Sequence, residues 1–235
     1  MIILSLLVCF LSNLQASVVK VACVGNSITF GAGISNRDRD SYPSVLGQML
    51  GEGYEVRNFG FSARTCLNKG DYPYMKEKMF QDALGYNPDI VIIKLGTNDT
   101  KPQNWVYKNE YKKDLTSMVR AFKTFATNPK IYLCYPAKAY AVQYGINDSL
   151  IVKDVIPYID EVAKQTGCPV IDLHSVTSGM PENFPDKIHP NPAGAHTIAA
   201  TVYKAIMGKA SDHQMQAFPG KKSEWKGVDR YDFQF

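Results

Sequence analysis

Short apolar segments that alternate with longer helical patterns constrain the fold of this chain more than any other feature. Most of these segments are rich in β-branched residues and nearly continuous in apolar ones, as strands are when helices cover both faces of their sheet. Strands that alternate with helices of about ten or more residues imply right-handed crossovers. We therefore predict a three-layer α/β fold with a central, mostly parallel sheet of about five strands. The expected strands are residues 18–24, 54–58, 90–95, 131–134 and 170–172, and the expected helices are residues 42–50, 74–84, 108–126, 150–165 and 192–207.

The two ends of the chain differ from the part between them. Residues 1–16 form an apolar run that ends in Ala16, which is typical of a short bacterial signal peptide. This interpretation predicts a secreted or periplasmic protein; the alternatives are a buried first strand or an incorrectly placed start site. The run is too short to span a membrane. Residues 17–208 are expected to form one domain, and the polar residues 209–235 a C-terminal tail or a linker into a further domain.

Charge and cysteine content exclude several classes of partner and cofactor. The formal net charge is +4 and the lysines and arginines are scattered, so no basic stripe is available for nucleic acid. Beyond the first run there is no Cys-x-x-Cys pair, and the histidines have no ligand-like spacing, so we expect no metal and no other cofactor. Four cysteines follow that run, namely Cys23, Cys66, Cys134 and Cys168, and three of them lie in or beside apolar strand-like stretches, where a free thiol is typically buried. One disulfide in an oxidising compartment is the alternative.

A serine follows the first predicted strand, in the stretch Gly25-Asn26-Ser27. A residue at the carboxyl end of a strand projects into the crevice where open α/β sheets bind ligands. A serine there is also a common helix cap. Near the other end of the domain, Asp186 precedes His189 by three residues. A serine nucleophile needs a base to take its proton, and the base needs a carboxylate to orient it. The alternative is a polar turn before the last helix.

Acyl transfer also requires hydrogen-bond donors for the developing oxyanion, and two further segments could supply them. Gly60 ends the second predicted strand and offers a backbone N–H, while Asn98 follows the third and offers a side-chain amide. Their ordinary interpretations are a strand exit that contains glycine and an Asn-Asp turn. Because parallel strands end at one edge of a sheet, all these segments are expected to converge.

These four blocks, in this order, resemble the GDSL/SGNH hydrolase superfamily over about residues 18–207. The resemblance implies a flavodoxin-like fold in which His189 is the base and Asp186 its partner. It also implies that the oxyanion is held by the N–H groups of Ser27 and Gly60 and by the Asn98 amide. Ser27 is then the nucleophile. Asn26 departs from the pattern of the family, which usually has Asp before the serine.

The segment 60–74 resembles bacterial carbohydrate esterases, including sialate O-acetylesterases and acetylxylan esterases. Arg64 would then lie beside the oxyanion glycine and meet a carboxylate or sugar hydroxyls; the alternative is an arginine paired with a nearby acid. We expect a serine esterase that removes acyl groups, acetyl foremost, from a carbohydrate, with sialate as the first candidate. A lipid esterase or thioesterase and a non-catalytic sugar-binding module are the alternatives. The sequence predicts no oligomeric state.

Overall fold

The structure is a computed structural model that describes residues 17–124 and 127–208. The predicted signal peptide and the predicted tail or linker lie outside these residues. Within them, no helix is long and apolar enough to cross a membrane.

Five parallel strands form the central sheet, in the order β2-β1-β3-β4-β5. The prediction of a three-layer α/β fold is thus confirmed, and the sheet is parallel throughout. Backbone pairing extends each predicted strand by at most two residues or shortens it by one. The strands are β1 (Val19–Gly25), β2 (Tyr54–Gly60), β3 (Ile90–Lys94), β4 (Lys130–Cys134) and β5 (Val170–Ile171).

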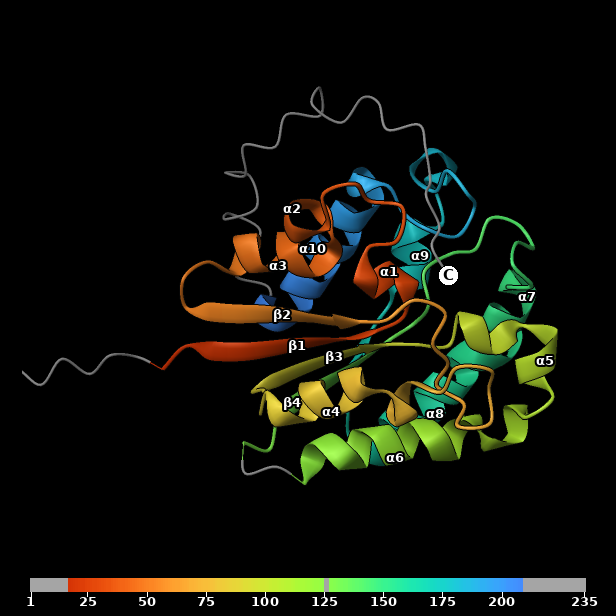
Figure 1. Cartoon of the computed structure of the whole chain (residues 1–235), viewed down its shortest axis with the longest axis horizontal. Helices are drawn as coiled ribbons and strands as arrows, with labels where there is room; N and C mark the ends of the chain where they lie inside the picture. The colour runs from red at the N-terminus through yellow and green to blue at the C-terminus, as the bar shows by residue number, and fades with distance from the viewer. Residues whose placement is uncertain (1–16, 125–126, 209–235) are drawn as a thin grey trace, which may run out of the picture.

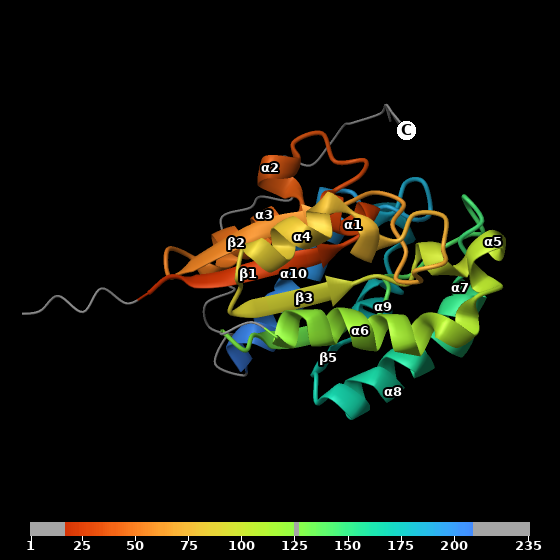
Figure 2. The same ribbon diagram turned by 60° about the horizontal axis from the view of Figure 1, so that its bottom comes forward.

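Helices cover both faces of the sheet (Figures 1 and 2). On one face, α3 (Tyr42–Leu50) and α10 (Pro192–Met207) pack over strand side chains that include Cys23 and Ile92. On the other, α4 (Lys78–Gly85), α6 (Tyr111–Lys123) and α8 (Ile156–Thr166) pack over the alternate strand residues, such as Val24 and Ile93. Successive side chains of a strand point to opposite faces, so a strand buried on both faces must be apolar at every position. This requirement explains the apolar runs at residues 21–24 of β1 and 90–93 of β3.

Two of the predicted helices, 42–50 and 192–207, have the expected bounds. The predicted helix 74–84 is interrupted at Glu77, whose backbone is extended, so a 3₁₀ turn precedes α4. The predicted helix 108–126 likewise begins as a 3₁₀ turn, and α6 ends at Lys123. The predicted helix 150–165 contains a π-helical turn before α8. Pro157 has no N–H to give to the carbonyl four residues earlier, which favours this wider turn.

The remaining elements are short and lie mainly in the loops that follow the strands. They are α1 (Ser27–Phe30), α2 (Arg37–Asp40), η1 (Tyr74–Lys76), η2 (Asn98–Thr100), α5 (Pro102–Trp105), η3 (Lys108–Glu110), α7 (Asp148–Leu150), η4 (Ile151–Val155), α9 (Leu173–Thr177) and η5 (Pro181–Asn183). The four cysteines of the described chain are all buried and free, so none of them forms a disulfide there.

Candidate active site

Ser27 begins the short helix α1 directly after β1. The side chain of Asn26 caps this helix by accepting a hydrogen bond from Ile28 N, and Gly31 ends it in the left-handed conformation with φ +90°. Gly25 allows the tight exit from the strand, because a Cβ there would lie 2.1 Å from Thr29 Oγ1. The local sequence therefore fixes the serine at the carboxyl edge of the sheet.

His189 and Asp186 come from the loop that precedes α10, and both side chains are largely buried. The imidazole Nε2 lies 2.8 Å from Ser27 Oγ, and Nδ1 lies 2.6 Å from Asp186 Oδ2. An ionised carboxylate can only accept a hydrogen bond, so Nδ1 is the donor and Nε2 is left to accept from the serine hydroxyl. The three side chains are thus aligned for transfer of the hydroxyl proton to the imidazole.

The surroundings of Asp186 keep it ionised. Burial alone raises the pKa of its carboxyl, but the hydrogen bond and the charge of His189 lower it. The backbone N–H groups of Ile188 and His189 also donate to Oδ1, at 3.0 and 2.7 Å. The net shift of the pKa is downward. An ionised, hydrogen-bonded carboxylate can orient the imidazole and stabilise its protonated form.

Asn98 lies at the exit of β3 and is almost completely buried. Its side-chain Nδ2 donates to the backbone carbonyl of Arg64 at 3.1 Å. The backbone carbonyl of Asn98 accepts from Asn104 Nδ2 at 2.9 Å. A side-chain amide carries two N–H donors, so one remains for a ligand. The neighbouring Asp99 accepts hydrogen bonds from Cys66 N and Leu67 N and so fastens the segment after β2 to this exit.

Gly60 does not have the geometry expected of an oxyanion donor. Its N–H already donates to Asn58 Oδ1, at 2.8 Å. A Cβ at this position would lie 2.2 Å from Phe30 N, so the glycine is required where β2 passes against the backbone of α1. The sequence predicts that the N–H of Gly60 is an oxyanion donor. In the structure, the lack of a side chain at Gly60 instead allows two backbones to approach closely.

A better-placed group of backbone donors follows, in the turn of residues 61–64. Phe61 N donates to Gly25 O at 2.9 Å, and Asn98 binds the carbonyl of Arg64, so this turn spans from the end of β1 to Asn98. Ala63 is in the left-handed conformation with φ +66°. Within the described chain the N–H groups of Ser62 and Ala63 donate no hydrogen bond. Turns with a left-handed residue align successive N–H groups into anion-binding hollows. Sequence gave no signal for this turn, because alanine rarely adopts φ > 0.

Arg64 is engaged by the protein. Its guanidinium lies 2.9 Å from Glu77 Oε1, donates to Ser62 O at 2.8 Å and stacks 3.4 Å from the centre of the Phe61 ring. Of the two interpretations from the sequence, the arginine paired with a nearby acid describes this geometry. Sialate as the substrate stays a prediction.

Lys94 is a buried residue of this region, and the sequence predicts it only as part of the strand 90–95. Its Nζ hydrogen-bonds Asn26 Oδ1 at 3.2 Å and Thr97 Oγ1 at 3.3 Å, and no carboxylate within the described residues pairs with it. Burial lowers the pKa of its ammonium to about 7. The lysine thus donates a hydrogen bond to Asn26, the residue that caps the Ser27 helix.

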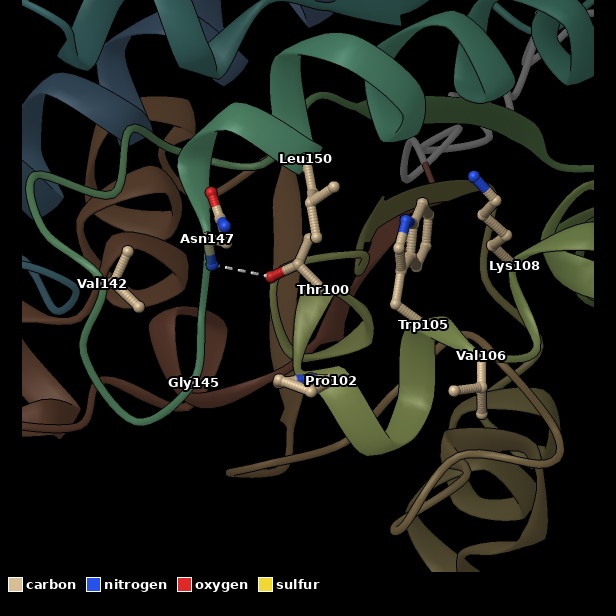
Figure 3. Close-up of a pocket in the computed structure, with 9 residues that line it drawn as sticks. All are labelled: Thr100, Pro102, Trp105, Val106, Lys108, Val142, Gly145, Asn147 and Leu150. Carbon is tan, nitrogen blue, oxygen red and sulfur yellow. Dashed lines mark hydrogen bonds between the residues drawn. The ribbon is translucent and has the colours of Figure 1, made fainter.

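A pocket of about 410 Å³ lies between the segment 100–108 and the segment 142–150 (Figure 3). It is lined by Thr100, in the turn that begins at Asn98, and by Gly145, the neighbour of Tyr144. Its lining is mostly apolar and includes Pro102, Trp105, Val106, Val142 and Leu150. Over the residues that the structure covers, no group of three His, Cys, Asp or Glu side chains could hold a metal ion.

The fold agrees with that of several solved esterases. A putative arylesterase from Agrobacterium tumefaciens superposes with a TM-score of 0.67 at 22% identity, covering 80% of this chain and 98% of the other. The carbohydrate acetylesterase Est24 from Sinorhizobium meliloti superposes with a TM-score of 0.66 at 20% identity, with the same coverage. At these identities the likeness is one of fold.

Sequence comparison identifies the family to which this chain belongs. An acetylxylan esterase from Xylanibacter ruminicola is 45% identical over 80% of this chain and 43% of its own length. This chain therefore spans less than half of that relative. The sequence pattern of the GDSL-like lipase/acylhydrolase family matches residues 23–196, and the chain belongs to that family.

Proposed function

We propose that this protein is a carbohydrate acetylesterase that uses Ser27 as nucleophile, His189 as base and Asp186 as its partner. The observation that carries the proposal is the continuous hydrogen-bonded line from Asp186 through His189 to Ser27 Oγ, with separations of 2.6 and 2.8 Å. The acetylxylan esterase similar to this chain supports an acetylated carbohydrate as substrate.

The reaction follows two steps of acyl transfer. His189 takes the proton of Ser27, whose oxygen attacks the ester carbonyl. The negative oxygen that forms is held by Ser27 N–H, the Asn98 amide and the N–H groups of the turn at Ala63. His189 then protonates the leaving sugar oxygen, and the acyl-enzyme remains. Water, deprotonated by His189, attacks this ester; His189 then returns the proton to Ser27 Oγ as acetate leaves.

Replacement of the nucleophile tests the proposal. We expect Ser27→Ala to reduce hydrolysis of 4-nitrophenyl acetate and of acetylated xylan by at least about 10³-fold, because covalent catalysis is lost. The side chain is small and lies at the start of α1, so the melting temperature should change little. Acetate release and thermal unfolding measure the two effects. A variant that keeps near-normal turnover contradicts the proposed nucleophile.

A lipid esterase is the second candidate, and the apolar pocket that Thr100 lines, two residues after Asn98, favours it. The same assay with acetyl to octanoyl esters separates the two functions. A carbohydrate acetylesterase should lose activity as the acyl chain lengthens. Rising kcat/KM up to octanoyl would favour the lipid esterase.

A further inference from the structure

The loop between β4 and α7 carries a tight hairpin next to the candidate site. Gln143 and Ile146 pair as an antiparallel bridge, and Ile146 N donates to Gln143 O at 2.9 Å. The two residues between them, Tyr144 and Gly145, have φ values of +53° and +77°. Two central residues with positive φ define a type I′ turn.

Tyrosine is an unusual residue for the first central position of such a turn. Gly is favoured there because it has no Cβ to approach the following carbonyl oxygen, and Asn and Asp because their short polar side chains can hydrogen-bond locally. A bulky residue held in this conformation suggests selection for its side chain rather than for the turn. The Tyr144 ring is 44% exposed. Its centre lies 6.2 Å from the centre of the His189 ring.

Hydrogen bonds hold the hairpin on both sides, so the position of its backbone is defined. Ahead of it, Tyr140 N donates to Lys187 O at 2.8 Å, which ties the loop to the segment that carries His189. Behind it, Asn147 N donates to Thr100 Oγ1 at 3.0 Å, which ties the loop to the turn that carries Asn98. Asp148 accepts from Ala139 N at 2.9 Å and closes the base of the loop.

The chemistry of the proposed reaction determines which part of a substrate lies beside the rings of Tyr144 and His189. His189 must deliver a proton to the leaving oxygen, so the alcohol half of the ester lies on the side of the imidazole. In a sugar ester this half is a pyranose, whose axial C–H bonds form an apolar face that packs on aromatic rings. An exposed aromatic ring beside the imidazole provides such a surface.

We propose that Tyr144 is the wall on which the ester-bearing sugar ring stacks, and that it makes the enzyme selective for sugar esters over small aliphatic esters. The inference rests on the proposed function and adds to it the subsite for the leaving group. The ring acts by binding the alcohol half of the substrate, whereas the chemistry at the carbonyl is left to Ser27 and His189.

The test uses substitutions matched to the turn. Tyr144→Asn removes the ring but suits the left-handed position, so the hairpin should persist and the melting temperature should not fall. Tyr144→Phe keeps the ring and is the control. The substrates are a methyl xyloside monoacetate and ethyl acetate. For Tyr144→Asn we expect kcat/KM on the sugar ester to fall about fivefold to tenfold, mainly through KM. Ethyl acetate hydrolysis should stay within twofold, and Tyr144→Phe should retain both activities.

Three outcomes would overturn the proposal. Equal losses on both esters, with a shifted pH profile of kcat, would mean that Tyr144 acts only on His189. Unchanged selectivity in Tyr144→Asn would mean that the ring does not contact the sugar, while the proposed function would stand. A wild-type protein that cleaves ethyl acetate but no sugar acetate would refute the proposed function itself, and the subsite with it.

Discussion

Lys94 and Asn26 form an uncommon buried pair behind the nucleophile. Asn26 Oδ1 accepts from both Ile28 N and Lys94 Nζ, at 3.2 Å each. Its Nδ2 is buried and has no hydrogen-bond partner among the described residues. A buried unsatisfied donor costs about 1–3 kcal/mol, and a buried ammonium without an anion costs more. The amide of Asn26, next to Ser27 in the chain, and the ammonium of Lys94 thus both destabilise the folded protein.

A double-mutant cycle measures how these two residues depend on each other. Asn26→Asp should be tolerated, because the new carboxylate accepts the same two hydrogen bonds and neutralises Lys94. The same substitution in a Lys94→Met background leaves a buried carboxylate without a cation, which typically costs about 3–5 kcal/mol. We expect a coupling free energy on the order of 3 kcal/mol from urea unfolding of the four proteins at pH 7. Additive effects would show that Lys94 does not hold position 26.

Residue identity alone identified part of the candidate site. Ser27, His189 and Asp186 could be predicted because acyl transfer needs these residue types and because they lie in short sequence motifs. Ala63 and Tyr144 were not visible, because their relevance lies in a left-handed backbone that neither residue type favours. Lys94 was hidden within a strand that had been interpreted as apolar. The chemistry of a side chain can be read from sequence, but an unusual conformation or a buried charge cannot.

The packing of β2 against α1 determines where Ser27 lies. Gly60 brings the end of β2 so close to α1 that an added Cβ would lie 2.2 Å from Phe30 N and 2.5 Å from Thr29 C. Both contacts are with backbone atoms, which cannot move aside as the end of a flexible side chain can. The position of α1, and with it the nucleophile, depends on the absence of a side chain at residue 60.

Gly60→Ala separates this role from that of an oxyanion donor. Alanine keeps the backbone N–H, so a site that used only that donor would keep its turnover. Because a Cβ forces α1 away from β2, we expect a loss of stability of about 1–3 kcal/mol and a loss of kcat of at least about tenfold. Thermal unfolding measures the loss of stability, and hydrolysis of 4-nitrophenyl acetate measures the loss of kcat. Gly47→Ala is the control, since a Cβ there makes only ordinary contacts beyond 3.4 Å. Full activity in Gly60→Ala would contradict the packing argument.

Element boundaries were predictable where one local rule dominates. Residues 42–50 and 192–207 have strong starts and stops, including a proline in the first turn and a glycine after the last, and both helices have the predicted bounds. The 3₁₀ and π turns before α4, α6 and α8 were not predictable from periodicity. They depend on how each loop enters its helix, which tertiary contacts decide.

The whole molecule brings its candidate site together from segments far apart in the chain. The loops after β1, β2 and β3 and the loop before α10 meet because parallel strands end at one edge of the sheet. Beneath this edge, β3 ends in the buried Lys94. A buried lysine at the end of the middle strand makes folding stability depend on pH as a property of the entire domain.

The sign of that dependence follows from the lowered pKa of Lys94. Burial holds it at about 7 in the folded protein, against 10.5 for the free side chain. Between these values the unfolded chain binds the additional proton, so stability rises with pH. The folding penalty is largest below pH 7. From pH 7 to 8 the expected gain in the free energy of unfolding is about 1 kcal/mol.

Urea unfolding at pH 7.0, 7.5 and 8.0 measures this slope below the ordinary pKa of a free cysteine thiol, about 8.5. Lys94→Met should abolish the rise, because no proton is then taken up on unfolding at position 94. Lys164→Met removes an exposed lysine and should preserve it. An equal rise in Lys94→Met and the wild type would mean that the ammonium of Lys94 stays charged in the folded protein, and its burial would then require an anion that this site does not offer.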